Sequence, residues 1–233
     1  MTTWAGEEAQ RIGPVSGIDV VPGVELSVTI DHQDIHLLGY FVDHTDRHLQ
    51  EYLALMRDER LKRAKRIVHK LNELGIPLKF DAVLRQAGDA SVGRPHVAAA
   101  LLLEGLTTTY HEAFIRYIGF GKPAYEEKYH VTPEEAIDTV AAAGGLSFIA
   151  HPGSSMDERT LLALINAGVD GIEVVHPAHS AELVAHYTGI ADEYFLLGSG
   201  GSDFHGGKRN DETTLGKYFI PLEQVEMMRR RLR

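Results

Sequence analysis

Apolar and polar positions repeat in a helix-then-strand order through the second half of the chain. Each helix-like stretch is followed by a short apolar run, which is typical of a buried parallel strand. The three runs are 146–151, 171–176 and 195–205, which end at His151, at His176, and at Asp203 with His205. Repeated strands that end in histidine or aspartate predict a metal site at the C-terminal mouth of a β/α barrel.

Helix signals precede these runs. Thr132-Pro-Glu-Glu135 offers an N-cap, a proline at the first helical position and a glutamate that completes a capping box. The helix that begins there is expected to end at Gly144-Gly145. The later elements predicted are helices over 157–167 and 180–193, a strand over 217–220 and a terminal helix from Pro221.

The first half of the chain changes character near residue 48. Before it, 18–30 reads as a strand interrupted by Pro-Gly, with Glu25 just after the turn, and 34–42 reads as a second strand that carries His36. After it, apolar positions follow helical spacing with glycines as end markers. The helices predicted in this block cover 49–74, 80–87, 95–104 and 108–117. A block without strands breaks the β/α rhythm, so 48–128 is expected to be a helical insertion.

Composition narrows the chemistry. The 233 residues include 13 histidines and no cysteine, which leaves only nitrogen and oxygen ligands for a metal. The net charge of −10 argues against a surface that coats nucleic acid. No long apolar run and no basic-then-apolar leader pattern is visible, so a cytoplasmic location and no membrane contact are expected.

The sequence Gly198-Ser-Gly-Gly-Ser-Asp203-Phe-His205 is the strongest single metal signal, because glycines permit a tight bend and the two ligand types suit Zn, Mn or Fe. Its alternative is a polar loop in which Asp203 caps a helix. His151 before Pro152 follows the same logic, with a packed loop residue as the alternative.

Glu25 and His36 are weaker signals when taken singly. Glu25 is either a bridging metal ligand or a surface carboxylate. A lone histidine in an apolar strand, such as His36, is more often a core residue, and only the other candidates favour ligation. His176 and His179 are candidates for the mouth of the site, either as donors that support a metal ligand or as substrate contacts, and the alternative for His179 is that it only caps the next helix.

Four other features concern phosphate and base recognition. Arg94, in Gly93-Arg-Pro-His96, stands at a predicted helix N-terminus, where a guanidinium and free N–H groups suit a phosphate. The alternative is a surface arginine near a helix cap. Lys122 and Tyr125 are weaker candidates for a phosphate contact and a base-stacking ring. The basic run 57–70 is typical of a solvated helix face rather than of nucleic-acid binding.

Taken in order, these motifs resemble the PHP (polymerase and histidinol phosphatase) superfamily. The motifs are Pro22-Gly-Val-Glu25-Leu-Ser, His36-Leu-Leu-Gly-Tyr, Gly93-Arg-Pro-His96, Ala150-His-Pro152, Glu173-Val-Val-His176-Pro and Gly201-Ser-Asp-Phe-His205-Gly. The branch that they resemble comprises bacterial phosphoesterases acting on nucleoside 3′,5′-bisphosphates and short RNA 5′ ends. The resemblance extends over essentially the whole chain.

The resemblance implies an α/β fold, a distorted (β/α)7 TIM-like barrel formed by 1–47 and 129–233, with 48–128 as a helical insertion over its mouth. It implies up to three divalent metal ions, Mn, Fe or Zn, and hydrolysis of a phosphate monoester by metal-activated water. No stable protein partner is predicted. The implied ligands are Glu25, His36, His151, Asp203 and His205, with Arg94 on the substrate phosphate and His176 as the candidate to protonate the leaving oxygen.

The sequence departs from the family pattern at its start. The Asp-x-His-x-His and Thr-Asp-His-Asp motifs of the family are missing, and the first residues resemble the helix that follows them. The retained downstream residues favour an N-terminally incomplete barrel, and a decayed, non-catalytic PHP-like module is the alternative. A second alternative is an amidohydrolase-like metal hydrolase, which also ends its strands in histidine and aspartate.

Overall fold

The computed structural model of the chain describes residues 5–31, 33–207 and 211–232. They divide into two compact units. One is the helical segment Glu51–Tyr129, and the other combines the described residues before Glu51 with those from His130 onward. The role predicted for 48–128 as an insertion over a barrel mouth stays a prediction.

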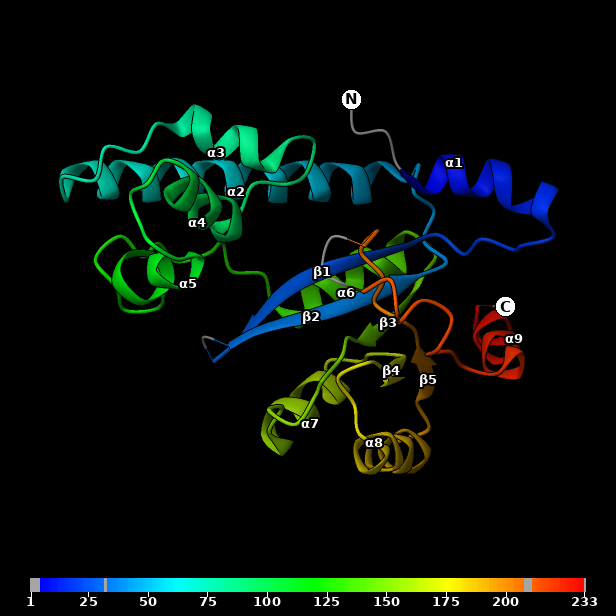
Figure 1. The fold of residues 1–233 in the computed structure, drawn as a ribbon. Coiled ribbons are helices and arrows are strands. Elements are labelled where there is room, and N and C mark those ends of the chain that lie inside the picture. The colour runs from blue at the N-terminus through cyan, green and yellow to red at the C-terminus, as the bar shows by residue number, and fades with distance from the viewer. Residues whose placement is uncertain (1–4, 32, 208–210, 233) are drawn as a thin grey trace. The chain divides into compact units, whose positions relative to one another are not determined.

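The second unit is a mixed α/β structure, which confirms the predicted class (Figure 1). The first residues of α2 (Arg47–Glu73) also belong to it. Its other elements are α1 (Ala5–Ile12), the 3₁₀ helix η1 (Gly13–Ser16), β1 (Gly23–Ile30), β2 (Gln33–Tyr40), α6 (Pro133–Ala142), β3 (Leu146–Ile149), α7 (Glu158–Asn166), β4 (Gly171–Val175), α8 (Ala181–Glu193), β5 (Leu197–Gly200) and α9 (Leu222–Arg231).

The five strands form one sheet in the order β1-β2-β3-β4-β5. β2 runs antiparallel to its two neighbours, β1 and β3, whereas β3, β4 and β5 run parallel. The three parallel strands consist mainly of buried residues and have helices between them, as expected for α/β crossover units. Their C-terminal ends therefore lie at the same edge of the sheet.

Helix α6 begins where its capping residues predict. Thr132 accepts a hydrogen bond from the Glu135 N–H and Glu135 returns one to the Thr132 N–H, which confirms the capping box of α6. The strand predicted over 217–220 is wrong. The backbone of that segment is turn and irregular structure, because no described strand pairs with it. The side chain of Phe219 is exposed.

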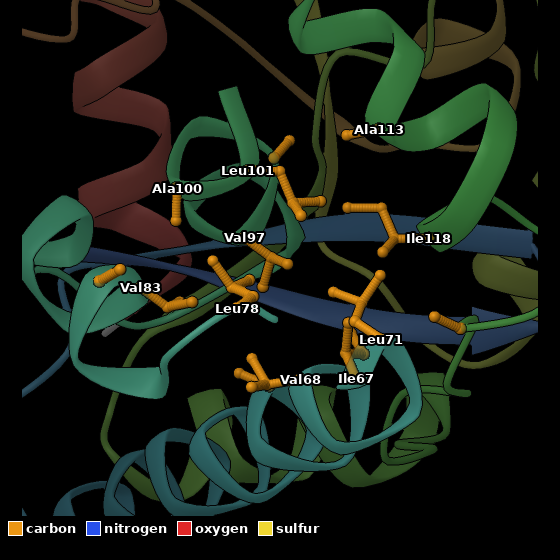
Figure 2. Packing of buried hydrophobic residues seen from close by; sticks show 14 of the residues in the cluster. Ile67, Val68, Leu71, Leu78, Val83, Val97, Ala100, Leu101, Ala113 and Ile118 are labelled. Carbon is orange, nitrogen blue, oxygen red and sulfur yellow. The ribbon is translucent and has the colours of Figure 1, made fainter. Parts of the chain in front are cut away.

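The helical unit contains the rest of α2, α3 (Phe80–Ala87), α4 (Arg94–Leu103), α5 (Tyr110–Ala113) and the π-helix η2 (Phe114–Ile118), with no strand among its described residues. The helix predicted over 108–117 is thus two short elements. Side chains from these helices meet in one apolar core (Figure 2). Its fully buried members include Ile67, Leu71, Leu78, Val83, Val97, Leu101 and Ile118.

None of the described helices combines the length and the apolar character that crossing a bilayer requires. The longest of them, α2, has 27 residues and carries charged side chains along its length.

Gly171 at the start of β4 should be intolerant of any side chain. A Cβ there would lie 2.2 Å from Cε1 of buried Phe148 and 2.4 Å from the carbonyl oxygen of Leu197. We expect Gly171→Ala to lower the free energy of unfolding by about 3 kcal/mol through overpacking. In the matched control Gly189→Ala, inside α8, a Cβ meets nothing within 4 Å. Gly189→Ala should raise the free energy of unfolding by up to about 1 kcal/mol. Urea unfolding measures both, and equal effects would contradict the prediction.

Candidate metal centre

Glu25 on β1 and His36 on β2 lie on the same face of their hairpin. Leu26 and Leu37 pair across the two strands and are buried on one face. Because side chains alternate along a strand, Glu25 and His36, each one residue earlier, point to the other face as diagonal neighbours. Nδ1 of His36 lies 2.6 Å from Oε1 of Glu25. Strand pairing alone therefore brings a carboxylate and an imidazole together.

The end of β3 adds His151 to this pair. The N–H of Ala150 donates to the carbonyl oxygen of His36 at 3.0 Å, so the chain leaves β3 directly beside His36. The ring centroids of His36 and His151 are 5.4 Å apart, and Nε2 of His151 lies 3.5 Å from Oε1 of Glu25. The potential ligand atoms of Glu25, His36 and His151 all lie within 4.8 Å of one another, a spacing that suits one metal ion.

Charge in this triad is strongly coupled. His151 and His36 hold the pKa of the Glu25 carboxyl well below its usual range. Glu25 in turn raises the pKa of His151, against the effect of burial. The carboxylate is therefore ionised at any physiological pH and attracts a cation, whether a proton on the histidines or a metal ion.

A second group of candidates follows β4 and β5. Nε2 of His176 lies 3.6 Å from Oδ2 of Asp203, and the ring of His176 is 5.3 Å from that of His151. Nδ1 of His205 donates to the carbonyl oxygen of Asp203 at 2.7 Å. This hydrogen bond fixes the proton on Nδ1 and leaves Nε2 of His205 as the lone-pair nitrogen, as in many metal-binding histidines.

Two of these candidates have strained backbones. His151 has a φ of 27° and Asp203 a φ of 47°, in the left-handed region that residues with side chains seldom adopt. Such conformations cost on the order of 1–3 kcal/mol each and cluster at functional sites. Both residues are among the five predicted ligands, and both directly follow the parallel strands.

His176 differs from the other histidines in its protonation. Its Nδ1 accepts a hydrogen bond from the Ala178 N–H at 3.1 Å, so the neutral ring carries its proton on Nε2. Nε2 is buried and has no hydrogen-bond partner among the described residues. Burial and the nearby His151 lower the pKa of His176, which keeps the ring neutral. His176 therefore presents an N–H donor, 3.6 Å from Oδ2 of Asp203, rather than a metal-binding lone pair.

The sequence analysis missed two buried carboxylates that support the ligands. Glu173 on β4 accepts a hydrogen bond from the His151 N–H at 2.7 Å, and burial raises the pKa of Glu173 to about 7. Asp211 accepts a hydrogen bond from the His205 N–H. A glutamate within the buried run 171–175 is a detectable signal, because glutamate is rarely buried without a partner. The loop residue Asp211 carries no such signal.

His179, predicted as a substrate contact, uses both ring nitrogens within the protein. Nδ1 donates to the carbonyl oxygen of Val174 at 2.9 Å, and Nε2 accepts from the Gly153 N–H at 3.1 Å. The ring is buried beside Tyr187. No ring nitrogen of His179 remains for a phosphate or a metal ion.

The three remaining candidates belong to the helical unit. Arg94 is the first residue of α4, and its guanidinium lies over the Tyr125 ring, 5.8 Å from the centroid. Arg63 and Lys70 donate to the carbonyl oxygens of Glu126 and Tyr125, which fixes that segment. Within the described part of the chain, no carboxylate pairs with Arg94. Lys122 is exposed.

Known proteins are similar to this chain in sequence. The 3′,5′-nucleoside bisphosphate phosphatase of Chromobacterium violaceum is 32% identical over 204 residues, which cover 85% of this chain and 72% of that protein. The chain belongs to the PHP family of metal-dependent phosphoesterases. A 5′-3′ exoribonuclease of Haemophilus influenzae is 33% identical over 204 residues, covering 85% of this chain and 74% of the relative. No protein-family model matches the chain.

A solved structure from Bifidobacterium adolescentis, described as a metal-dependent phosphoesterase, superposes on this PHP-family chain with a TM-score of 0.78 at 28% identity. The superposition covers 95% of this chain and 80% of the other. The predicted family membership and the predicted enzyme class, a metal-dependent phosphoesterase, are thereby confirmed.

Proposed function

We propose that this PHP-family enzyme hydrolyses a phosphate monoester of a nucleotide, such as a nucleoside 3′,5′-bisphosphate, or acts at the 5′ end of short RNA. The names of the relatives in Chromobacterium violaceum and Haemophilus influenzae support these two substrate classes. The observation that carries the metal-dependent chemistry is the Glu25–His36–His151 triad, with its ligand atoms within 4.8 Å of one another.

The donor set fits a divalent Mn, Fe or Zn ion, because it consists of carboxylate oxygen and imidazole nitrogen without thiolate. Glu25, His36 and His151 would hold one ion, and Asp203 and His205 would contribute to a neighbouring position. A metal ion bound there supplies Lewis acidity that activates water and offsets charge on the phosphate oxygens. The complete family site, with up to three ions, remains an implication of the resemblance.

His176 is proposed as the donor to the leaving oxygen. The buried Nε2–H, which makes no hydrogen bond within the described residues and has Oδ2 of Asp203 3.6 Å away, supports this role, because a phosphoester oxygen could accept from it. The neutral ring donates a hydrogen bond that stabilises the charge developing on the leaving oxygen as the bond to phosphorus breaks. The proton that this oxygen finally takes comes from water, because a neutral imidazole that gave up its N–H proton would become an imidazolate.

Recognition of the substrate is proposed to involve the helical unit. Arg94, the first residue of α4, offers a bidentate guanidinium fork that suits a phosphate. Tyr125 offers an aromatic face for a base, and exposed Lys122 offers a further cation. The barrel formed by 1–47 and 129–233, with 48–128 as an insertion over its mouth, is part of the same proposal.

The test starts with metal content. The purified 233-residue chain is analysed by inductively coupled plasma mass spectrometry, and phosphate release from adenosine 3′,5′-bisphosphate is then measured with added Mn²⁺. A short 5′-phosphorylated RNA is tested in parallel for release of nucleotides or phosphate from its 5′ end, and a nucleoside 5′-monophosphate serves as the comparison in the phosphate assay. We expect bound metal and chelator-sensitive release from the bisphosphate or the RNA.

Two results would contradict this function. A chain without metal affinity and without activity supports a non-catalytic module. A metal-bound chain that hydrolyses no phosphoester but cleaves cyclic amides supports an amidohydrolase instead.

A further inference from the structure

The segment 151–153 bends sharply between β3 and α7. His151 and Gly153 have φ values of 27° and 61°, and Pro152 separates them. Glycine tolerates this region, whereas a histidine does not adopt it without support from its surroundings. The direction of the His151 imidazole depends on this bend, because the ring leaves the backbone at the strained residue. The polar groups that hold the segment therefore control a ligand of the proposed metal centre.

Three buried side chains hold the backbone of this segment. Glu173 accepts from the His151 N–H at 2.7 Å, and His179 accepts from the Gly153 N–H at 3.1 Å. The Tyr187 hydroxyl donates to the Gly153 carbonyl oxygen at 2.6 Å. All three side chains are at most 8% exposed, so water does not replace these hydrogen bonds. They come from β4, from the loop after it and from α8.

The hydrogen bonds of His179 leave only one arrangement of its proton. A carbonyl oxygen can only accept, so Nδ1 carries the proton toward Val174, and Nε2 must accept from Gly153. The ring thus ties the segment to the end of β4. It lies between the rings of His176 and Tyr187, with centroid distances of 5.5 Å to each, which fixes its plane.

We propose that Glu173, His179 and Tyr187 are positioning residues, which hold the 151–153 segment so that His151 points at Glu25 and binds metal. The proposal rests on the metal-dependent function proposed above. Removal of a group that hydrogen-bonds to a metal-ligating residue and fixes its orientation weakens metal binding by about 10- to 100-fold. His179 is then a support for the site and not a substrate contact.

The first test is Tyr187→Phe, which removes only the hydroxyl. The metal-stripped 233-residue protein is titrated with Mn²⁺ and with Zn²⁺ against a chromophoric chelator, and thermal unfolding is recorded in parallel. We expect Tyr187→Phe to weaken metal binding about 10-fold. The matched control is Tyr194→Phe at the end of the same helix, where the side chain is 40% exposed, and it should bind metal like the wild type.

The second test compares two changes at Glu173. Glu173→Gln retains an oxygen that accepts from the His151 N–H, whereas Glu173→Leu does not. We expect Glu173→Gln to restore near wild-type metal affinity and Glu173→Leu to lose at least about 10-fold. The absorption spectrum of bound Co²⁺, which reports ligand geometry, should change in Glu173→Leu and in Tyr187→Phe but not in Glu173→Gln.

The outcomes separate this inference from the proposed function. A wild-type protein that binds no metal overturns the function. A wild-type protein that binds metal, with Tyr187→Phe and Glu173→Leu variants that match its affinity and Co²⁺ spectrum, overturns the positioning role alone. Lower thermal stability with unchanged metal affinity also overturns it, because a merely structural hydrogen bond gives that result.

Discussion

Replacing Glu25 with glutamine should lower the kcat/KM of metal-dependent phosphate release by about 10³-fold, equivalent to several kcal/mol of transition-state stabilisation. The glutamine keeps the size of the side chain but removes the charge that holds a cation between His36 and His151. Metal content per chain should fall in the same sample. Steady-state kinetics and inductively coupled plasma mass spectrometry measure the two effects.

The matched control is Glu193→Gln on α8, which removes an exposed carboxylate outside the triad. It should leave metal content and kinetics unchanged. A Glu25→Gln variant that retains full metal content and activity would show that the metal centre lies elsewhere.

The wild type and Glu25→Gln should also differ in thermal stability, by an amount that depends on pH. The lowered pKa of Glu25 stabilises the metal-free fold above about pH 4.5 and loses this effect as the pH falls. The raised pKa of His151 stabilises the fold below about pH 6.5 and loses this effect as the pH rises. The wild type should therefore exceed Glu25→Gln in melting temperature most clearly between pH 4.5 and 6.5, and chelator-treated protein measures this.

Much of the fold could be predicted because local signals agreed with tertiary contacts. The capping box at Thr132, the glycines that follow α6 and α7, and the buried runs before His151 and His176 all specify their elements locally. The strand expected over 217–220 failed because a strand requires a neighbour, and none of the described strands pairs there. Apolar character alone does not supply one.

Some residues of the candidate site could likewise be predicted from the sequence, and others could not. Glu25 and His36 are brought together by hairpin register, which alternation along each strand already specifies. Glu173 and Tyr187, which hydrogen-bond the backbone of the 151–153 segment, were not predicted as supports of the site. Their role depends on the bend of that segment, which the sequence does not reveal. The sequence left two roles open for His179, support of a metal ligand or contact with substrate, and its two backbone hydrogen bonds favour the first.

Substitution of Arg94 tests whether the helical unit takes part in the reaction. Arg94→Ala should lower kcat/KM for a nucleoside 3′,5′-bisphosphate by about 10²-fold, since hydrogen bonds to a charged group contribute about 1.5–3 kcal/mol each. Arg94→Lys should recover only part of the loss, because a lysine supplies charge without the bidentate fork. Metal content should not change in either variant.

The control for Arg94 is Arg85→Ala on α3, which removes an exposed arginine paired with Glu104 in the same unit. It should match the wild type in both kcat and KM. Loss of metal in Arg94→Ala, or equal kinetics in Arg94→Ala and Arg85→Ala, would remove Arg94 from substrate binding. If Arg94→Ala retains its metal but loses kcat/KM selectively, the first turn of α4 recognises the substrate phosphate. This role is separate from the metal chemistry of Glu25, His36 and His151.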